Sequence, residues 1–353
     1  MKSASGGLSL LALAIAVAPP SAAAQAARVH TSSIRSGSDT YERRSLGGRN
    51  GVAVDYFISR PAGRQPLILY IQGSGCAPAF FETQPGQYAS TIFSLTTVAH
   101  RPGHAVMVAD KPFAPSRPPR GGGLATDCPD AFNRSFSLET WVAALDAALR
   151  DAMRRPWVRP GRILVIGISE GATAAAALAA RNPAVTDVAL VGGSGPSQLY
   201  DFVAAAYAGS GTDAGRLKAI EGLQAQLAEI RADPDDWRKF AWGHSYKRWS
   251  SFFRASSVDN LRRSKARIYL VSGMADASVP ILSTEVIWSE LAPLGRDIRF
   301  RRIPGADHAL VPAGSDFGHS FPQIEAEFAA IVDWFDAGPD AASARPRQGL
   351  RGR

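Results

Sequence analysis

The chain has 353 residues, of which 46% are hydrophobic and 20% are charged, a composition typical of a globular protein. Its formal net charge of +8 gives little support to nucleic-acid binding, because four arginines lie in residues 345–353 and no basic helix or nucleic-acid motif accompanies them. We expect residues 341–353 to be a disordered, solvated basic tail, and we expect the protein to bind no nucleic acid.

The amino-terminal residues 1–26 have the pattern of a secretory signal peptide. Lys2 is followed by an apolar run at residues 8–18 and by small residues that end in Ala-Gln-Ala at 24–26. The apolar run is well short of the ~20 residues that a membrane-spanning helix needs, so an uncleaved anchor is the less favoured alternative. The pattern predicts an exported protein, periplasmic or secreted, without stable membrane insertion.

Residues 27–340 predict an α/β domain with a mostly parallel sheet and helices on both faces. Residues 28–49 are polar and irregular, and residues 52–59 alternate well enough for an antiparallel strand at the sheet edge. Helical patterns at residues 138–153 and 323–335 lie between apolar runs, which indicates a parallel core. Its strands are expected at residues 67–71, 105–109, 163–166, 188–191, 268–271 and 298–303.

A glycine-rich loop, Gln-Gly-Ser-Gly-Cys at residues 72–76, follows the first of these core strands. Cys76 and Cys128 are the two cysteines of the sequence, and an exported chain meets an oxidising environment, so we expect a disulfide between them. The bond would fasten the loop to the segment at residues 112–133 and stabilise the fold by about 4 kcal/mol in the chain-entropy model. The alternative is that both cysteines are buried and unpaired.

Residues 167–171 read Gly-Ile-Ser-Glu-Gly and stand between the apolar run at 163–166 and an alanine-rich segment at 172–180. This is the pattern of a nucleophile elbow. The turn holds its central residue in an uncommon backbone conformation, and the flanking glycines let neighbouring backbone approach. The sequence therefore predicts that the Oγ atom of Ser169 projects from the sheet edge as a nucleophile.

Residues 196–257 interrupt the alternation of strands and helices. The interval is largely helical in pattern at residues 217–230 and has no convincing strand, so we interpret it as a cap inserted over the sheet edge. We expect two or three of its aromatic residues to line an apolar pocket above Ser169, which would favour a substrate with an apolar or aromatic portion. The alternative is that they pack the cap onto the body. These residues are Trp237, Phe240, Trp242, Tyr246, Trp249, Phe252 and Phe253.

Two later strands are each followed by a loop with a titratable residue. The loop Gly-Met-Ala-Asp-Ala-Ser-Val-Pro at residues 273–280 contains Asp276, and the loop Pro-Gly-Ala-Asp-His-Ala-Leu at residues 304–310 contains His308. A serine hydroxyl needs a base to become a nucleophile, and the base needs an acid that orients it. We therefore expect His308 to be the general base and Asp276 its orienting acid, with His319 as the alternative base.

In these motifs the chain resembles the α/β-hydrolase superfamily over residues 46–337, and its loops are shared by the dienelactone-hydrolase-like and prolyl-oligopeptidase-like branches. The resemblance implies a catalytic triad in the order serine, acid, histidine, with each member after a strand. Ser169, Asp276 and His308 match that order.

The resemblance also implies an oxyanion hole built from main-chain N–H groups. Gln72, the first residue of the glycine-rich loop, stands where related hydrolases carry the histidine of a His-Gly-x-Gly motif. The donors would be the N–H of Glu170 and that of either Ser74 or Gly75. We expect the Glu170 carboxylate to turn aside and complement the helix dipole, with contact to substrate as the alternative.

Together these features predict an exported serine hydrolase that cleaves a small-molecule ester through an acyl-enzyme and uses no metal and no organic cofactor. A serine peptidase of the same fold is the nearest alternative. A catalytically silent ligand-binding protein of this fold is the alternative from another functional class. The substrate and the oligomeric state do not follow from the sequence.

Overall fold

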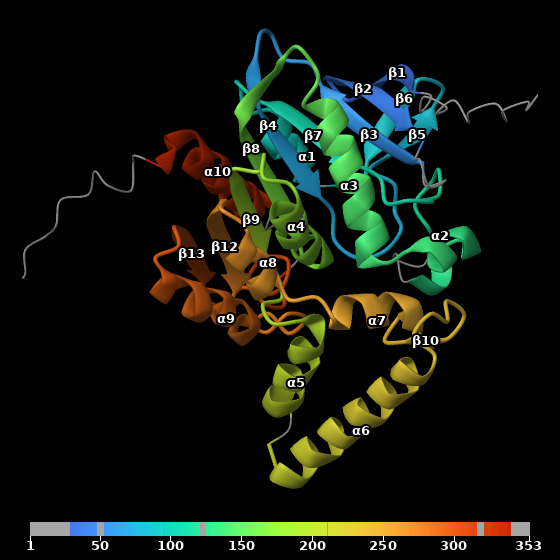
Figure 1. The fold of residues 1–353 in the computed structure, drawn as a ribbon, viewed down its shortest axis with the longest axis vertical. Helices are drawn as coiled ribbons and strands as arrows, with labels where there is room; N and C mark the ends of the chain where they lie inside the picture. The colour runs from blue at the N-terminus through green and yellow to red at the C-terminus, as the bar shows by residue number, and fades with distance from the viewer. Residues whose placement is uncertain are drawn as a thin grey trace, which may run out of the picture.

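The computed structural model describes residues 29–47, 53–92, 94–120, 125–209, 211–315 and 321–339. The predicted signal peptide and basic tail lie outside these ranges. Within them, eleven strands form one sheet in the order β13-β12-β9-β8-β4-β7-β3-β2-β1-β6-β5 (Figure 1). The strands are β1 Val29–Ser36, β2 Asp39–Leu46, β3 Val54–Ser59, β4 Gln65–Ile71, β5 Phe80–Gln84, β6 Gln87–Ser90, β7 Ala105–Ala109, β8 Val158–Ile168, β9 Asp187–Val191, β12 Arg267–Gly273 and β13 Ile298–Ile303.

Six strands run parallel and form the centre of the molecule. β4 lies between β7 and β8 and is parallel to both, and β9 and β12 continue the sheet from β8 to β13. β7 and β9 are buried along their whole length, as expected for apolar strands that are covered on both faces. All six strands that the sequence predicted for the parallel core are present.

The antiparallel part of the sheet differs from the prediction. β3 is not an edge strand, because it pairs with β2 on one side and β7 on the other. β1 and β2 form a hairpin within the segment that was expected to be irregular. Hydrophobic alternation misses this hairpin because one of its buried positions is Arg44, whose Nε atom donates to Asp151 Oδ2 at 2.8 Å. The hairpin β5–β6 continues the sheet beyond β1.

Alternating strand residues build two hydrophobic layers, one on each face of the sheet. Ile71 belongs to the layer that contains Trp141 of α3, whereas its neighbour Tyr70 belongs to the layer that contains Phe328 of α10. Helices α3, α4, α8 and α9 contribute to the first layer, and α1 and α10 to the second (Figure 1). The helices of the body are α1 Leu95–Ala99, α2 Asp130–Ser135, α3 Leu138–Ala152, α4 Glu170–Arg181, α8 Ser257–Arg263, α9 Ile281–Leu291 and α10 Phe321–Ala337, with short 3₁₀ turns at η1 Ala125–Asp127 and η2 Ala292–Leu294.

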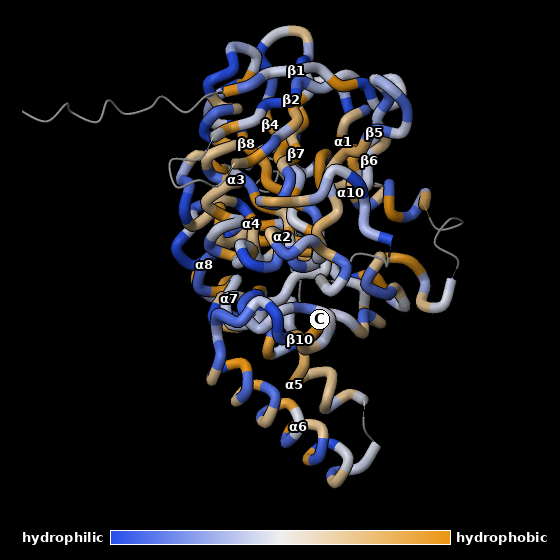
Figure 2. Tube along the Cα trace, turned by 90° about the vertical axis from the view of Figure 1, so that its right-hand side faces the viewer, coloured by the Kyte–Doolittle hydropathy of each residue, from blue (hydrophilic) through white to orange (hydrophobic). Residues whose placement is uncertain are grey.

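The insertion at residues 196–257 is mainly helical, as predicted. It contains α5 Gln198–Gly209, α6 Asp213–Ala232 and α7 Tyr246–Phe253, with the two-residue strands β10 Phe240–Ala241 and β11 His244–Ser245. Figures 1 and 2 show α5 and α6 extending away from the body, whereas α7 lies against it. None of the helices in the described ranges combines the length and hydropathy that a membrane crossing requires.

Candidate active site

Ser169 occupies a strained turn between β8 and α4. Its backbone has φ 54° and ψ −121°, which confirms the uncommon conformation expected of the elbow. The flanking positions have no room for a side chain. A Cβ atom on Gly167 would lie 2.2 Å from Gly171 O, and one on Gly171 would lie 2.4 Å from Gln72 O. The turn therefore depends on backbone contacts that any side chain at these two positions would prevent.

His308 and Asp276 are joined by a hydrogen bond, with 2.7 Å between His308 Nδ1 and Asp276 Oδ2. The other carboxylate oxygen, Oδ1, accepts from the N–H groups of Ser278 and Val279, both at 2.8 Å. The Asp276 side chain is fully buried, while 29% of the His308 side chain is exposed. The carboxylate is thus locked in place, and the imidazole reaches from it toward the surface.

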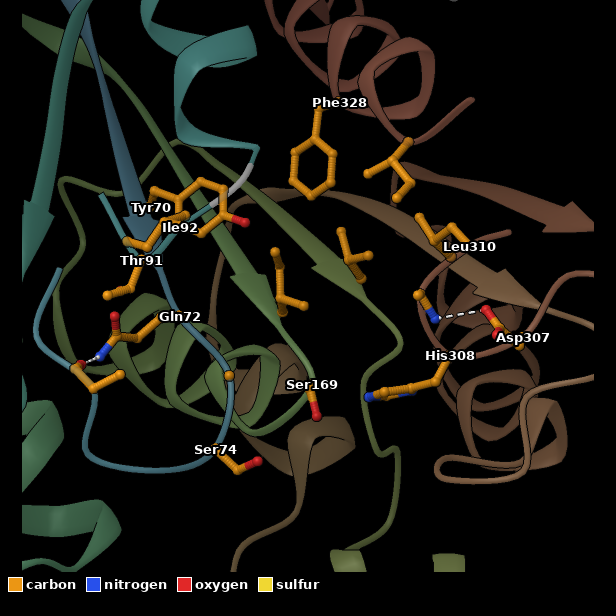
Figure 3. A pocket seen from close by; sticks show the side chains of 16 residues that line it. Tyr70, Gln72, Ser74, Thr91, Ile92, Ser169, Asp307, His308, Leu310 and Phe328 are labelled. Carbon is orange, nitrogen blue, oxygen red and sulfur yellow. Dashed lines mark hydrogen bonds between the residues drawn. The ribbon is translucent and has the colours of Figure 1, made fainter. Parts of the chain in front are cut away.

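The loops after β8, β12 and β13 bring the three predicted residues to one edge of the sheet. Figure 3 shows the His308 ring beside the Ser169 hydroxyl. Gly192, directly after β9, has φ 56°, and a Cβ atom there would lie 3.1 Å from the His308 ring. The absence of a side chain at Gly192 leaves room for the imidazole next to Asp276.

The glycine-rich loop after β4 lies beside Ser169. A Cβ atom on Gly73 would be 3.5 Å from the Ser169 Cβ atom, so the loop backbone passes close to Ser169. The side chain of Gln72 donates across the loop to Ala77 O at 2.8 Å. A disulfide joins Cys76 to Cys128, with 5.9 Å between their Cα atoms, which confirms the predicted pairing.

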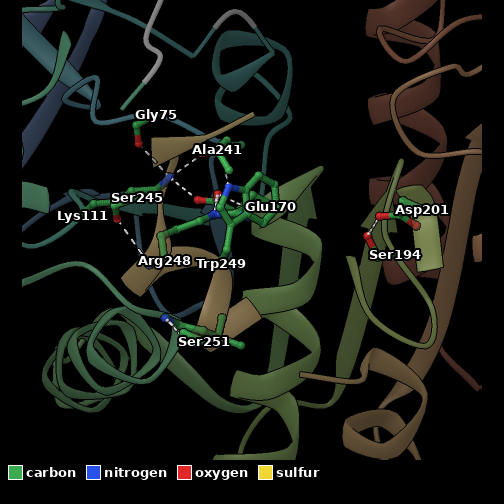
Figure 4. Close-up of polar contacts among 12 residues, drawn as sticks. Gly75, Lys111, Glu170, Ser194, Asp201, Ala241, Ser245, Arg248, Trp249 and Ser251 are labelled. Carbon is green, nitrogen blue, oxygen red and sulfur yellow. Dashed lines mark hydrogen bonds and ion pairs between the residues drawn. The ribbon is translucent and has the colours of Figure 1, made fainter. Parts of the chain in front are cut away.

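A buried ion cluster that the sequence analysis missed lies behind this loop (Figure 4). We define it as Lys111, Glu170 and Arg248. Glu170 Oε1 accepts from Lys111 Nζ at 2.7 Å, and Oε2 accepts from Arg248 Nε at 3.0 Å. Glu170 therefore turns aside from the cavity, as expected, but its partners are two basic side chains, Lys111 from the segment after β7 and Arg248 from α7.

The charges of this cluster favour an ionised Glu170. Burial alone would raise the pKa of Glu170, but the charges of Lys111 and Arg248 lower it to about 2. Burial lowers the pKa of Lys111, and the nearby Glu170 carboxylate opposes that effect. Burial and the Arg248 charge lower the pKa of His244 to about 3, so this neighbouring ring is neutral near pH 7. Each oxygen of the Glu170 carboxylate thus has a basic side chain as its partner.

A second buried carboxylate lies on the side of His308 and Asp276. Asp201 of α5 accepts a hydrogen bond from the hydroxyl of Ser194, which follows β9 (Figure 4). Burial raises the pKa of Asp201 to about 6, although the Ser194 hydrogen bond acts in the other direction. The insertion therefore contacts the sheet edge on both sides of the site, through Asp201 and through Arg248.

A cavity of about 450 Å³ opens next to Ser169 and His308 (Figure 3). Its walls come from β4, the segment before α1, the His308 loop and α10, and most of its side chains are apolar. The lining residues are Tyr70, Gln72, Gly73, Ser74, Ala77, Thr91, Ile92, Ile168, Ser169, Val191, Asp307, His308, Ala309, Leu310, Ile324 and Phe328.

Comparison with known proteins gives matches among solved structures, whereas no family model and no curated protein matches the chain. Acetyl xylan esterase 1 from Thermoanaerobacterium sp. has a TM-score of 0.52 at 16% identity, over 85% of this chain and 88% of the esterase. The α/β hydrolase GrgF from Penicillium sp. has a TM-score of 0.52 at 13% identity, over 83% of this chain and 96% of that chain. Pyrococcus horikoshii acylaminoacyl peptidase has a TM-score of 0.54 at 11% identity, over 89% of this chain but 41% of the peptidase.

This chain has the α/β-hydrolase fold. The parallel sheet, the helices on both of its faces and the strand-end loops are those expected for the fold, so the predicted fold class is confirmed. At identities of 11–17% the likeness concerns the fold alone, and the activity has to be argued from the site.

In this α/β-hydrolase fold the insertion does not form the cavity wall that the sequence analysis expected. None of the seven aromatic residues that the prediction named lines the cavity beside Ser169. Instead Trp242, Trp249 and Phe253 pack against one another and against Phe202 of α5, mostly edge to face, with ring centroids 4.6–6.3 Å apart. The prediction was wrong because aromatic density in the sequence does not reveal whether the rings face the site or each other.

The remaining histidines have other partners. His100 pairs with Asp39 and His104 pairs with Asp336, in both cases through Nε2. His319, the alternative base, lies outside the described residues. Asp110 and Lys111 directly follow β7 and so share the sheet edge with Ser169, a position that could have identified Lys111 from sequence. Arg248 lies in the insertion and does not follow a core strand, so its position in the sequence does not indicate a place near Ser169.

Proposed function

We propose that this protein is an exported serine hydrolase that cleaves carboxylic esters. The observation that carries the proposal is the arrangement of a strained Ser169, the His308 ring beside it and the 2.7 Å hydrogen bond from that ring to Asp276. Elbow strain presents the hydroxyl, and the buried carboxylate selects the tautomer of His308 that has its proton on Nδ1. The Nε2 atom is then free to accept a proton.

In the proposed reaction, Ser169 Oγ forms a bond to the carbonyl carbon of the ester while His308 Nε2 takes the hydroxyl proton. The tetrahedral oxyanion accepts hydrogen bonds from the N–H of Glu170 and from an N–H of the loop at residues 72–76. The alcohol leaves with the proton from His308, which produces an acyl-enzyme. A water molecule, deprotonated by His308, then attacks the acyl carbon; the bond to Ser169 Oγ breaks, Oγ takes the proton back from His308, and the acid is released.

The cavity supports a substrate with an apolar or aromatic portion. Tyr70, Ile92, Leu310 and Phe328 form apolar walls within reach of Ser169, and a volume of about 450 Å³ suits a small organic acyl group. Export is supported by the signal-like pattern at residues 1–26 and by the disulfide between Cys76 and Cys128, because such bonds persist in oxidising compartments.

Labelling with a fluorophosphonate probe tests the chemistry. The purified protein should become covalently labelled, Ser169→Ala should lose the label, and the matched surface variant Ser289→Ala should keep it. A folded wild-type protein that does not react would favour the ligand-binding alternative, and labelling that persists in Ser169→Ala would reject this serine as the nucleophile.

A substrate panel tests the bond that is cleaved. We expect hydrolysis of p-nitrophenyl esters with short and medium acyl chains at rates well above those of aminoacyl anilides. The reverse order of rates would replace the esterase proposal by a peptidase.

A further inference from the structure

The Lys111 ammonium group donates its three N–H groups to two backbone carbonyls and one carboxylate near Ser169. Its Nζ atom lies 2.7 Å from Gly73 O, 2.8 Å from Gly75 O and 2.7 Å from Glu170 Oε1. An ammonium group has three donors, so none is left over. The side chain is fully buried, and these contacts join the loop after β4 to the residue that follows the nucleophile.

These contacts fix the direction of one particular N–H group. In a planar trans peptide the C=O and the following N–H point in opposite directions. Because the Gly73 carbonyl points at Lys111, the N–H of Ser74 points away from it, toward the side where Ser74 and Ser169 line the cavity (Figure 3). Among the hydrogen bonds of the described residues, the Ser74 N–H has no acceptor.

The same loop is held from its far end by the residue next to Lys111. Asp110 Oδ1 accepts from the N–H of Ala79 at 2.6 Å, and the disulfide at Cys76 fixes the loop between the two. The Lys111 ammonium also lies 4.3 Å from the ring centroid of Trp141 and 4.9 Å from that of Phe136. A charge in this fully buried position needs such partners, whereas an apolar side chain would fill the same space without them.

We propose that Lys111 is a positioning residue that aims the Ser74 N–H at the developing oxyanion, opposite the N–H of Glu170. The inference rests on the proposed hydrolase function and selects Ser74 over Gly75, which the sequence left open.

The test compares Lys111→Met with Arg44→Met, a matched variant that removes a buried, carboxylate-paired cation from β2, away from the site. Lys111→Met should lower kcat on p-nitrophenyl butyrate by about 100-fold and leave KM within about threefold, because a donor to the oxyanion acts in the transition state. A trifluoromethyl ketone, which forms an oxyanion adduct with the serine, should lose affinity by a similar factor. Arg44→Met should lower the melting temperature and leave both quantities unchanged.

A double-mutant cycle identifies the group through which Lys111 acts. Ser74→Pro deletes the N–H in question, so adding Lys111→Met to it should cost less than threefold further in kcat. Lys111→Gln, which keeps two donors for the two carbonyls, should recover part of the lost kcat, and it serves as the test if the methionine variant does not fold.

Two outcomes would contradict the inference in distinguishable ways. The role of Lys111 alone would be overturned if the wild type is active and the Lys111 variants have the same kcat as Arg44→Met. It would also be overturned if Lys111→Met lowers kcat by the full 100-fold in the Ser74→Pro variant. A wild type that neither hydrolyses esters nor reacts at Ser169 would overturn the proposed function and this inference with it.

Discussion

The two sides of Ser169 differ sharply in chemistry. On one face of the sheet, Tyr70 of β4 and Phe328 of α10 border an apolar cavity. On the other face, beyond Ile71, Lys111 and Glu170 form the buried ion cluster with Arg248. The apolar side sets the shape of the space beside Ser169. The ionic side sets the direction of the backbone.

This difference has a physical origin. Dispersion and burial on the cavity side have no preferred direction, so that wall can change shape by substitution without moving the backbone. Hydrogen bonds to an ammonium are directional, and their loss leaves buried groups without partners. We therefore expect substitutions on the apolar side to alter substrate selectivity, and substitutions on the ionic side to alter turnover or stability.

The largest effect on kcat is expected for His308, which lies beside Ser169 (Figure 3). His308→Ala should lower kcat by about 10⁴-fold because it removes the proposed general base, and Asp276→Asn should have a similar effect by favouring the wrong tautomer of that histidine. The melting temperature of His308→Ala should stay near that of wild type, since the ring is partly exposed. Steady-state kinetics and thermal unfolding measure both quantities, and wild-type rates in either variant would remove that residue from the mechanism.

The next effect concerns stability on the ionic side. Glu170→Gln leaves Lys111 and Arg248 without their buried carboxylate and should lower the free energy of unfolding by about 3–5 kcal/mol at pH 7. The folded protein lowers the pKa of Glu170 from 4.5 to about 2, so this stabilisation is present above pH 4.5 and is lost as the pH falls toward 2.

Urea unfolding across this pH range tests the prediction. The stability difference between wild type and Glu170→Gln should narrow as the pH falls below 4.5, because only the wild type has this carboxylate to protonate. The exposed control Glu221→Gln should differ little from wild type at every pH. A difference that stays constant with pH would mean that the Glu170 carboxylate is not what stabilises the cluster.

The smallest effect is expected on the apolar side. Ile92→Trp should fill part of the cavity and lower kcat/KM for a medium-chain p-nitrophenyl ester by about tenfold, while activity on the acetate ester changes little. Relative kcat/KM values along a series of acyl chain lengths measure this shift. Equal losses on short and long esters would indicate that the acyl group binds elsewhere.

Most of the parallel core and the positions of the main polar residues could be predicted from the sequence. Apolar runs revealed the six core strands, and the glycine-flanked Ser169 lay where one of them turns into a helix. The carboxyl ends of parallel strands share an edge, so Asp276 and His308 were expected beside it, and a hydrogen bond joins them. The hairpin β1–β2 was not predicted because one of its buried positions carries a charge.

The amino-acid sequence by itself determined what depends on local pattern: strand burial, the strained turn at Ser169 and the loops that follow the strands. Only the tertiary structure decided which partners meet across the chain, such as Lys111 with Gly73, and which way the aromatic side chains of the insertion face. The reason is physical. Periodicity and turn chemistry act between near neighbours, whereas ion pairing and cavity shape depend on where distant segments come to lie once the sheet has formed.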